Sequence, residues 1–222
     1  MNNLILVRHG QSQWNKEKRF TGWADIDLTD KGKSEAEYAG KLIKELDIDF
    51  DVCFTSELKR AINSLNIILK VLKKQNTQII KAWELNERHY GNLTSLNKDE
   101  IIKKHGIKQV HVWRRSFDIS PPPMDLNHPY IKKIYSSKSK SKMPKSESLK
   151  DTYNRVIPYY KSKIEPLLSI NKNVLVAFHG NTCRSLLKKI FNISEKKIVK
   201  FEVPTGNPLL IKLDKLKVKE YR

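Results

Sequence analysis

Residues 4–15 read Leu4-Ile5-Leu6-Val7-Arg8-His9-Gly10-Gln11-Ser12-Gln13-Trp14-Asn15. The first four residues form an apolar run with β-branched members, which is typical of a strand buried on both faces of a sheet. The run then changes abruptly to Arg8-His9-Gly10, so a cation and an imidazole stand where the strand leaves its sheet. Gly10 would let the backbone pass close to a ligand. Ligands of open α/β sheets bind beyond the carboxyl ends of strands, so this stretch is a candidate site.

A second stretch has the same pattern: Asn173-Val174-Leu175-Val176-Ala177-Phe178-His179-Gly180-Asn181. One histidine at a strand end is more often structural than catalytic. Two apolar runs that each end in His-Gly, with Arg8 in front of one of them, are far less frequent by chance. We therefore expect the imidazoles of His9 and His179 to lie beside each other at one edge of the sheet.

Between these stretches the chain alternates strands and helices. A helix with Thr29 as N-cap is expected to run to about Leu46, followed by a strand over 51–55. Ser56 then caps an amphipathic helix that carries Arg60 in its first turn, and 77–82 resembles a third strand. Strands that alternate with helices predict an α/β fold, a three-layer α/β/α sandwich with a mostly parallel sheet.

The pattern becomes irregular and polar past residue 84. We expect a single domain over 1–222 with a cap or insertion at about 84–147, of which 118–147 is loop-like and includes the Ser/Lys-rich Ser136 to Lys145. A long helix over 149–168, bent at Pro158, leads to the second His-Gly strand. A helix capped by Asn181 follows it.

Composition narrows the class of protein. The 222 residues carry a formal charge of +19, with 39% hydrophobic and 30% charged residues, which fits a globular chain with an anionic partner. The sequence has no zinc-ligand spacing and no RNA-binding aromatic signature, so a small anion is favoured over nucleic acid. Apolar runs are too short to span a membrane. Cys53 and Cys183 are expected to be buried and unpaired in a reducing cytoplasm.

Longer motifs around the two histidines resemble a known family. Besides Arg8 to Asn15 and His179, they are Phe20-Thr21-Gly22-Trp23, Asn86-Glu87-Arg88-His89-Tyr90-Gly91 and Trp113-Arg114-Arg115. Over nearly the whole chain, the sequence is similar to the cofactor-dependent phosphoglycerate mutases of the histidine phosphatase superfamily. The resemblance implies an isomerase of glycolysis and gluconeogenesis that interconverts 3-phosphoglycerate and 2-phosphoglycerate through a phosphohistidine. It also implies 2,3-bisphosphoglycerate as primer, no metal, and a homodimer or homotetramer.

The chemistry expected of the catalytic residues follows from the charge on a phosphoryl group. Fixed cations and convergent donors stabilise that charge, and Arg8, Arg60 and His179 are the candidates, helped by the helix start at Asn181. His9, with an ordinary imidazole pKa of about 6.5, is neutral often enough to attack phosphorus. The resemblance makes Glu87 the acid/base group. Burial would raise the pKa of Glu87 and nearby cations would lower it, and the sequence leaves that balance open.

The resemblance also assigns residues that bind substrate. They are Ser12, Asn15, Thr21, Gly22, Tyr90, Lys98, Arg114, Arg115, Gly180 and Asn181. Lys98 with the two adjacent arginines suits a second anionic group on the substrate. The alternatives are ordinary: neighbouring arginines often form a solvated helix face, Tyr90 could be a core aromatic, and Lys98 a surface charge.

Two other functions stay open at this stage. One is a phosphatase of the same superfamily that hydrolyses a phosphate monoester at His9, and the other is a non-catalytic protein that binds an anion or nucleic acid. The clamp for a second anion favours the mutase. The chain departs from the family at Ser95, where a glycine is usual, which predicts a local difference in backbone. It also ends at Arg222, where many members continue into a tail over the pocket, which predicts some phosphatase leakage.

Overall fold

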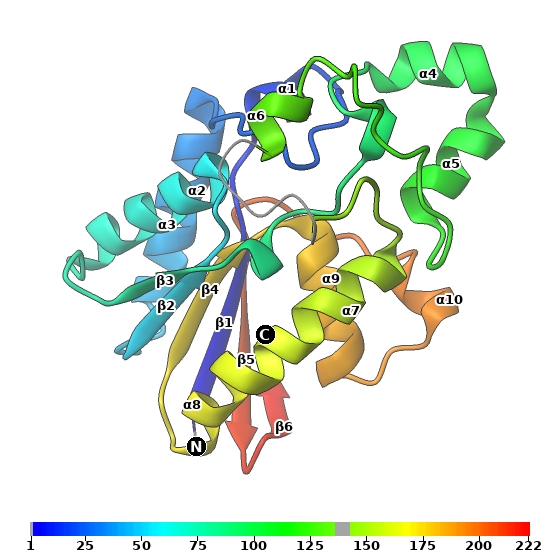
Figure 1. Ribbon diagram of the computed structural model, residues 1–222. Coiled ribbons are helices and arrows are strands. Elements are labelled where there is room, and N and C mark those ends of the chain that lie inside the picture. Colours follow the sequence, from blue (N-terminus) through cyan, green and yellow to red (C-terminus); the bar gives the residue numbers. More distant parts are fainter. Residues whose placement is uncertain (1, 136–142) are drawn as a thin grey trace.

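The strands form one mixed sheet in the computed structural model, which describes residues 2–135 and 143–222 (Figure 1). Within these residues the strand order is β3-β2-β4-β1-β5-β6. Strands β3, β2, β4 and β1 are parallel, β5 is antiparallel to β1, and β6 is antiparallel to β5. The bounds are β1 Asn2–Arg8, β2 Val52–Thr55, β3 Ile79–Lys81, β4 Val174–Phe178, β5 Pro208–Asp214 and β6 Lys217–Tyr221.

Helices cover both faces of the sheet, as the sandwich prediction requires (Figure 1). One face packs on α2 (Asp30–Lys44) and α3 (Lys59–Leu72). The other packs on α7 (Leu149–Tyr159), α8 (Glu165–Ser169) and α9 (Gly180–Ile190). The remaining helical elements are α1 Gln13–Lys16, η1 Trp83–Leu85, η2 Gly91–Leu93, α4 Lys98–His105, α5 Ile107–Arg115, α6 Ile131–Tyr135, the π-helical turn η4 Tyr160–Ile164 and α10 Glu195–Ile198. The expected fold class is therefore confirmed.

The central strands are apolar throughout because each supplies two cores. Leu4 and Leu6 of β1 belong to the cluster under α7 and α9, whereas Ile5 and Val7 belong to the cluster under α2 and α3. Successive side chains of a strand point to opposite faces, so a strand between two helical layers has no polar side. Burial of both sets fixes the position of residue 8, where β1 ends and the polar chemistry begins.

Several helix ends differ from the sequence expectation. Thr29 caps α2 as expected, its Oγ1 accepting the Gly32 N–H at 3.1 Å. Leu58, not Ser56, is the N-cap of α3, because the Ser56 hydroxyl accepts the Leu58 N–H and so turns the chain before the helix starts. Likewise α9 starts at Gly180 with His179 as N-cap, which places Asn181 inside the first turn.

The long helix after residue 148 is continuous, with a π-helical turn between two α-helical parts. It runs as α7, the π-helical turn and α8, ending at Ser169. The departure from α-helical geometry begins at Tyr160, two residues after Pro158. Proline has no N–H to donate to the preceding turn, which weakens the regular ladder there.

The described residues between β3 and α7, 82–135 and 143–148, lie over the carboxyl ends of the strands (Figure 1). Two small apolar clusters hold them, and each includes an aromatic residue from the loop after α1: Phe20 packs with Leu93 and Ile101, and Trp23 with Met124. The loop expected over 118–147 contains helix α6, and residues 136–142 of its Ser/Lys-rich stretch lie outside the described residues.

Two predictions from composition can also be compared with the structure. Cys53 and Cys183 are both buried and unpaired, as expected. In the described part of the chain, no helix combines the length and the apolar character that crossing a bilayer requires.

Candidate active site

A strongly basic pocket opens at the carboxyl ends of β1 and β4, with a volume of about 210 Å³. Seven arginine and lysine side chains line it, with two carboxylates. The lining residues are Arg8, His9, Asn15, Arg19, Phe20, Thr21, Gly22, Arg60, Glu87, Tyr90, Lys98, Arg114, Arg115, Gly180, Asn181, Arg184 and Glu202. The pocket is thus built to receive an anion.

The two histidines lie side by side at the base of the site. Strands β1 and β4 pair in parallel with Arg8 opposite Phe178, and the His9 N–H donates to the Phe178 carbonyl at 3.0 Å. The next residues, His9 and His179, have ring centroids 4.9 Å apart at an interplanar angle of 65°. His179 is completely buried behind the pocket wall, where its Nε2 is hydrogen-bonded to the Ser56 hydroxyl at 2.8 Å.

The hydrogen bonds of His9 fix its tautomer. Its Nδ1 lies 2.6 Å from the carbonyl oxygen of Gly10, and a carbonyl can only accept, so Nδ1 carries the proton. Nε2 therefore keeps its lone pair. Burial, and then the charges of Arg60 and Arg8, hold the pKa of His9 well below its usual value, so the ring is neutral at pH 7.

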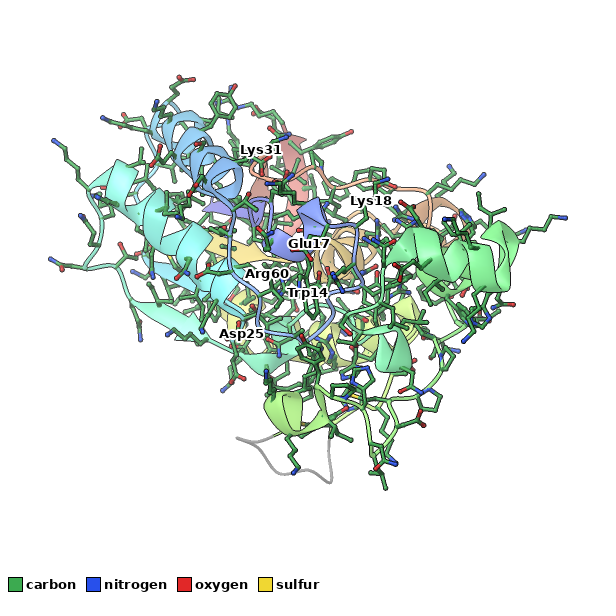
Figure 2. The ribbon with its side chains drawn as sticks, turned by 90° about the horizontal axis from the view of Figure 1, so that it is seen from above. Trp14, Glu17, Lys18, Asp25, Lys31 and Arg60 are labelled. Carbon is green, nitrogen blue, oxygen red and sulfur yellow. The ribbon has the colours of Figure 1, made fainter. Side chains whose placement is uncertain are left out.

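Two arginines are fixed beside this ring. Arg60 is 1% exposed and donates to the carbonyls of Ala24 at 2.9 Å and Gly22 at 2.7 Å. Seen from above, it lies near the middle of the molecule, beside the segment that carries Asp25 (Figure 2). Arg8 donates to the Val203 carbonyl at 2.6 Å. Burial lowers the pKa of Arg60 to about 10, which still leaves it charged at neutral pH.

Glu87 faces the pocket as an ionised carboxylate. Its Oε1 accepts the Arg88 N–H at 2.9 Å, the Asn181 N–H at 3.1 Å and the Asn181 side-chain amide at 2.9 Å. Burial alone would raise the pKa of Glu87. The hydrogen bonds from Arg88 and Asn181, with the charge of Arg60, outweigh burial, and the pKa falls below its ordinary value. The structure thus gives the balance that the sequence leaves open.

The same pocket holds the residues expected to bind a second anion. Lys98 begins α4, and Arg114 and Arg115 end α5, so both arginines reach the pocket from the last turn of a helix. Burial lowers the pKa of Lys98. Burial would raise the pKa of Tyr90, but the positive charge of Arg88 against its ring brings it down to about 8.

Two residues expected to bind or approach a ligand take other places, and a third, Asn181, lines the pocket but also has a second role. Ser12 does not line the pocket; its hydroxyl accepts the Asn15 N–H at 3.3 Å and caps the short helix that carries Asn15. Gly10 faces the backbone of Gly32, where an added Cβ would lie 2.0 Å from the carbonyl oxygen. Asn181 gives its backbone N–H to Glu87, so this helix start serves the carboxylate.

The pocket also contains Arg19, Arg184 and Glu202, which no motif indicated, and Phe20, which stands in a motif but was assigned no role. Arg184 lies three residues after Asn181 on α9, and its NH1 donates to the Asn181 Oδ1 at 2.7 Å. This helical spacing was a usable signal, because residues three apart share a face. Glu202 lies in an irregular segment and had no such signal.

Unpartnered polar atoms mark where an anion would complete the site. Among the described residues, Arg8 Nε and His179 Nδ1 are buried without a hydrogen-bond partner. Across the same residues, no group of three or more His, Cys, Asp or Glu could hold a metal ion. The site is suited to nucleophilic and acid/base chemistry on a phosphoryl group.

Comparison with known proteins agrees with this geometry. The family model described as "Histidine phosphatase superfamily (branch 1)" matches residues 4–218, and the chain belongs to that superfamily. Within it, three curated relatives are named 2,3-bisphosphoglycerate-dependent phosphoglycerate mutase. That of Pelagibacter ubique is 51% identical over 99% of this chain and 94% of its own length, that of Zymomonas mobilis 49% over 96% and 94%, and that of Treponema denticola 47% over 96% and 87%.

Solved structures show the same fold at lower identity. Bacillus stearothermophilus YhfR superposes with a TM-score of 0.73 at 22% identity, covering 99% of this chain and 95% of that one. The alpha-ribazole phosphatase from Shigella flexneri gives 0.72 at 19% identity, covering 97% and 93%. The expected family is confirmed.

Proposed function

We propose that this chain is a 2,3-bisphosphoglycerate-dependent phosphoglycerate mutase, which interconverts 3-phosphoglycerate and 2-phosphoglycerate. One observation carries the proposal. A neutral His9 with a free Nε2 stands beside Arg8, Arg60 and a second histidine, and three further basic side chains from α4 and α5 line the same pocket. A phosphatase needs only His9 and the groups beside it, not the further basic side chains. The names of the relatives at about half identity support the mutase.

The phosphoryl transfer uses His9 Nε2 as carrier. When phospho-His9 reacts, the N–P bond breaks, a bond forms from a substrate hydroxyl oxygen to phosphorus, and the hydroxyl proton passes to Glu87. Return of the other phosphoryl group forms the N–P bond again, breaks the second ester bond, and gives the proton of Glu87 to the leaving oxygen. Arg8, Arg60 and His179 stabilise the charge on the transferring oxygens.

The ionisation state of Glu87 suits this order of reaction steps. It is ionised before substrate arrives, so it is ready to act as a base on the hydroxyl. The carboxylate is oriented by Asn181 on α9 and by the N–H of Arg88, which fixes one of its oxygens. The other oxygen is the one available to the substrate.

The basic residues on α4 and α5 would hold the group of the substrate that does not react. Lys98, Arg114 and Arg115 provide three cations there, and Tyr90 lines the same pocket. The set assigned to substrate is completed by Asn15, Thr21, Gly22, Gly180 and Asn181, all of which line the pocket. Ser12 acts through Asn15, which it holds in place.

The primer, 2,3-bisphosphoglycerate, would supply the phosphoryl group that His9 carries. Two phosphates fit a pocket with seven arginine and lysine side chains and with buried donors that lack partners. Residues 84–147 would act as the cap over this pocket. A homodimer or homotetramer, a cytoplasmic location and the absence of a metal requirement stay predictions from the resemblance.

The decisive experiment incubates purified protein with 3-phosphoglycerate and a catalytic amount of 2,3-bisphosphoglycerate, and follows 2-phosphoglycerate. We expect rapid formation of 2-phosphoglycerate, and its loss by a factor of about 10⁴ or more in His9→Ala, because the carrier of the phosphoryl group is gone. His111→Ala, an exposed histidine on α5, should keep the wild-type rate. Release of inorganic phosphate without 2-phosphoglycerate would identify a phosphatase instead.

A further inference from the structure

A carboxylate stands on the rim of this basic pocket and is paired with one of its arginines. Glu202 Oε1 accepts from Arg115 NH2 at 2.5 Å, and its Oε2 lies 3.8 Å from Arg184 NH2. Arg115 is one of the cations proposed to hold the second anionic group of the substrate. The structure therefore places an internal anion on a substrate-binding arginine.

The contact is of a kind that a ligand can displace. The Glu202 side chain is 69% exposed, and an ion pair with one solvated partner contributes little to stability. Arg115 is 20% exposed and stays at the pocket wall. The anionic group of a ligand and the carboxylate of Glu202 would bind the same guanidinium. Because the two groups carry like charges, their repulsion weakens binding of the ligand unless Glu202 moves away.

We propose that Glu202 is a specificity-determining residue that competes with the second anionic group of the substrate for Arg115. The proposal rests on the function proposed above and deepens it. Exchange between an internal and an external anion keeps the pocket from holding multiply charged ligands too tightly. A ligand with one phosphate, held near His9, does not need Arg115 and is little affected.

Removing Glu202 should leave the catalytic half of the site intact. Arg184 keeps two other partners, the Asn181 Oδ1 at 2.7 Å and the Phe201 carbonyl at 2.7 Å. Asn181 in turn holds Glu87 through its side-chain amide. The acid/base group is thus positioned without Glu202, so binding and turnover can be separated.

The test measures binding by titration calorimetry in wild type, Glu202→Gln and Glu220→Gln. The control removes the same charge from an exposed carboxylate on β6 that pairs with Lys212 at 2.8 Å. For 3-phosphoglycerate we expect the Kd to fall about threefold to tenfold in Glu202→Gln, with little change in Glu220→Gln. The Kd for inorganic phosphate should fall by less than about twofold in Glu202→Gln. A higher salt concentration should reduce each of these gains in affinity.

A double-mutant cycle locates the effect. In an Arg115→Gln background, Glu202→Gln should no longer tighten binding of 3-phosphoglycerate, because the shared partner is absent. In Glu202→Gln with Arg115 unchanged, kcat should stay within about twofold of the wild-type value, and its pH profile should keep the wild-type shape.

Three outcomes would overturn the proposal: an unchanged or weaker Kd in Glu202→Gln, an equal gain in Glu220→Gln, or a gain that persists without Arg115. Failure of the proposed function is distinguishable. If wild type binds 3-phosphoglycerate but forms no 2-phosphoglycerate, the mutase is wrong and the comparison of Kd values still stands. Phosphoglycolate, which also carries a phosphate and a carboxylate, repeats that comparison with a ligand that cannot isomerise, and failure of both ligands to bind any variant would reject both proposals.

Discussion

Glu87 shows how a half-buried carboxylate in a pocket can stay charged. Burial opposes the charge, but one carboxylate oxygen accepts three N–H groups, and the guanidinium groups of Arg60 and Arg8 lie close enough to lower the pKa further. An acid with a depressed pKa keeps its charged form at neutral pH and loses it only as the pH falls through that lowered value. Glu87 is consequently ionised at neutral pH, as its proposed role as a base requires.

Glu87→Gln should lower kcat by about 10² to 10⁴, with a small change in KM, because the amide cannot take the hydroxyl proton. Ionisation of the substrate phosphate affects the kcat of wild type and variant equally, so its effect cancels in the ratio of the two kcat values. It should stay constant down to pH 4.5, the ordinary pKa of a glutamate, and narrow only below it.

Glu84→Gln, three residues earlier and outside the pocket lining, is the matched control and should retain activity. A ratio that already narrows near pH 7 would show that the carboxylate is protonated in the resting enzyme and would contradict this assignment.

The sequence indicated most residues of the pocket and missed those that act through others. Arg8, His9 and Arg60 could be found because each follows or closely adjoins a strand end. The role of Ser12 as a cap for the helix of Asn15, and the pairing of Glu202 with Arg115, depend on how distant segments come together. No local pattern encodes such contacts. Ser95 is likewise informative only in the structure, where its φ of +74° is the left-handed conformation that favours glycine.

At the scale of elements, α7 fixes the loop that carries Glu87. Arg155 donates to the carbonyls of Glu84 at 2.6 Å and of Asn86 and Glu87 at 3.0 Å. The same guanidinium pairs with Glu147, with Nε 2.6 Å from Oε1 and NH2 2.9 Å from Oε2. The two side chains are 9% and 2% exposed. Arg155 therefore links α7 to the loop of Glu87 through contacts that are nearly inaccessible to solvent.

Arg155→Met should destabilise the fold by about 3–5 kcal/mol, measured by urea unfolding, because Glu147 is left charged and buried without its partner. Adding Glu147→Gln should restore part of this loss. We also expect kcat to fall about tenfold to a hundredfold as the Glu87 loop loosens. Arg19→Met, which breaks an exposed pair with Glu17, should cost no more than about 1 kcal/mol. Equal costs for the two variants would refute the role of the buried pair.

The elements themselves were predictable wherever burial on one or two faces imposes a period. This holds for the apolar strands β1, β2 and β4 and for the amphipathic α2 and α3. Helix α6 and the start of α9 were not, because short helices and caps depend on single hydrogen bonds. Asn181 is a good N-cap residue by type, yet His179 takes that position and Asn181 binds Glu87 instead.

At the scale of the whole molecule, both cysteines report on unfolding. Cys53 lies in β2 and Cys183 in α9, on opposite faces of the sheet, and both are buried. Burial raises the pKa of each thiol to about 12, so neither forms the reactive thiolate at neutral pH. Access requires that a helical layer leave the sheet.

Native protein should therefore react very slowly with a thiol reagent at pH 7.5, whereas protein unfolded in urea should show two reactive thiols. If the layers open only by global unfolding, a ligand at about 100 times its Kd should slow labelling roughly a hundredfold. Fast labelling of Cys183 alone, with no effect of ligand, would instead show local opening of α9.

Pairing of β1 with β4 has a consequence for how the protein is made. The first strand leaves the ribosome early, with His9 at its end, but its neighbour in the sheet is not synthesised until most of the chain exists. A nascent or truncated chain that lacks the later strand cannot pair β1 with β4 and cannot set the imidazole of His9 against that of His179. Incomplete chains therefore lack phosphoryl-transfer activity, and an active molecule must have been synthesised beyond Gly180.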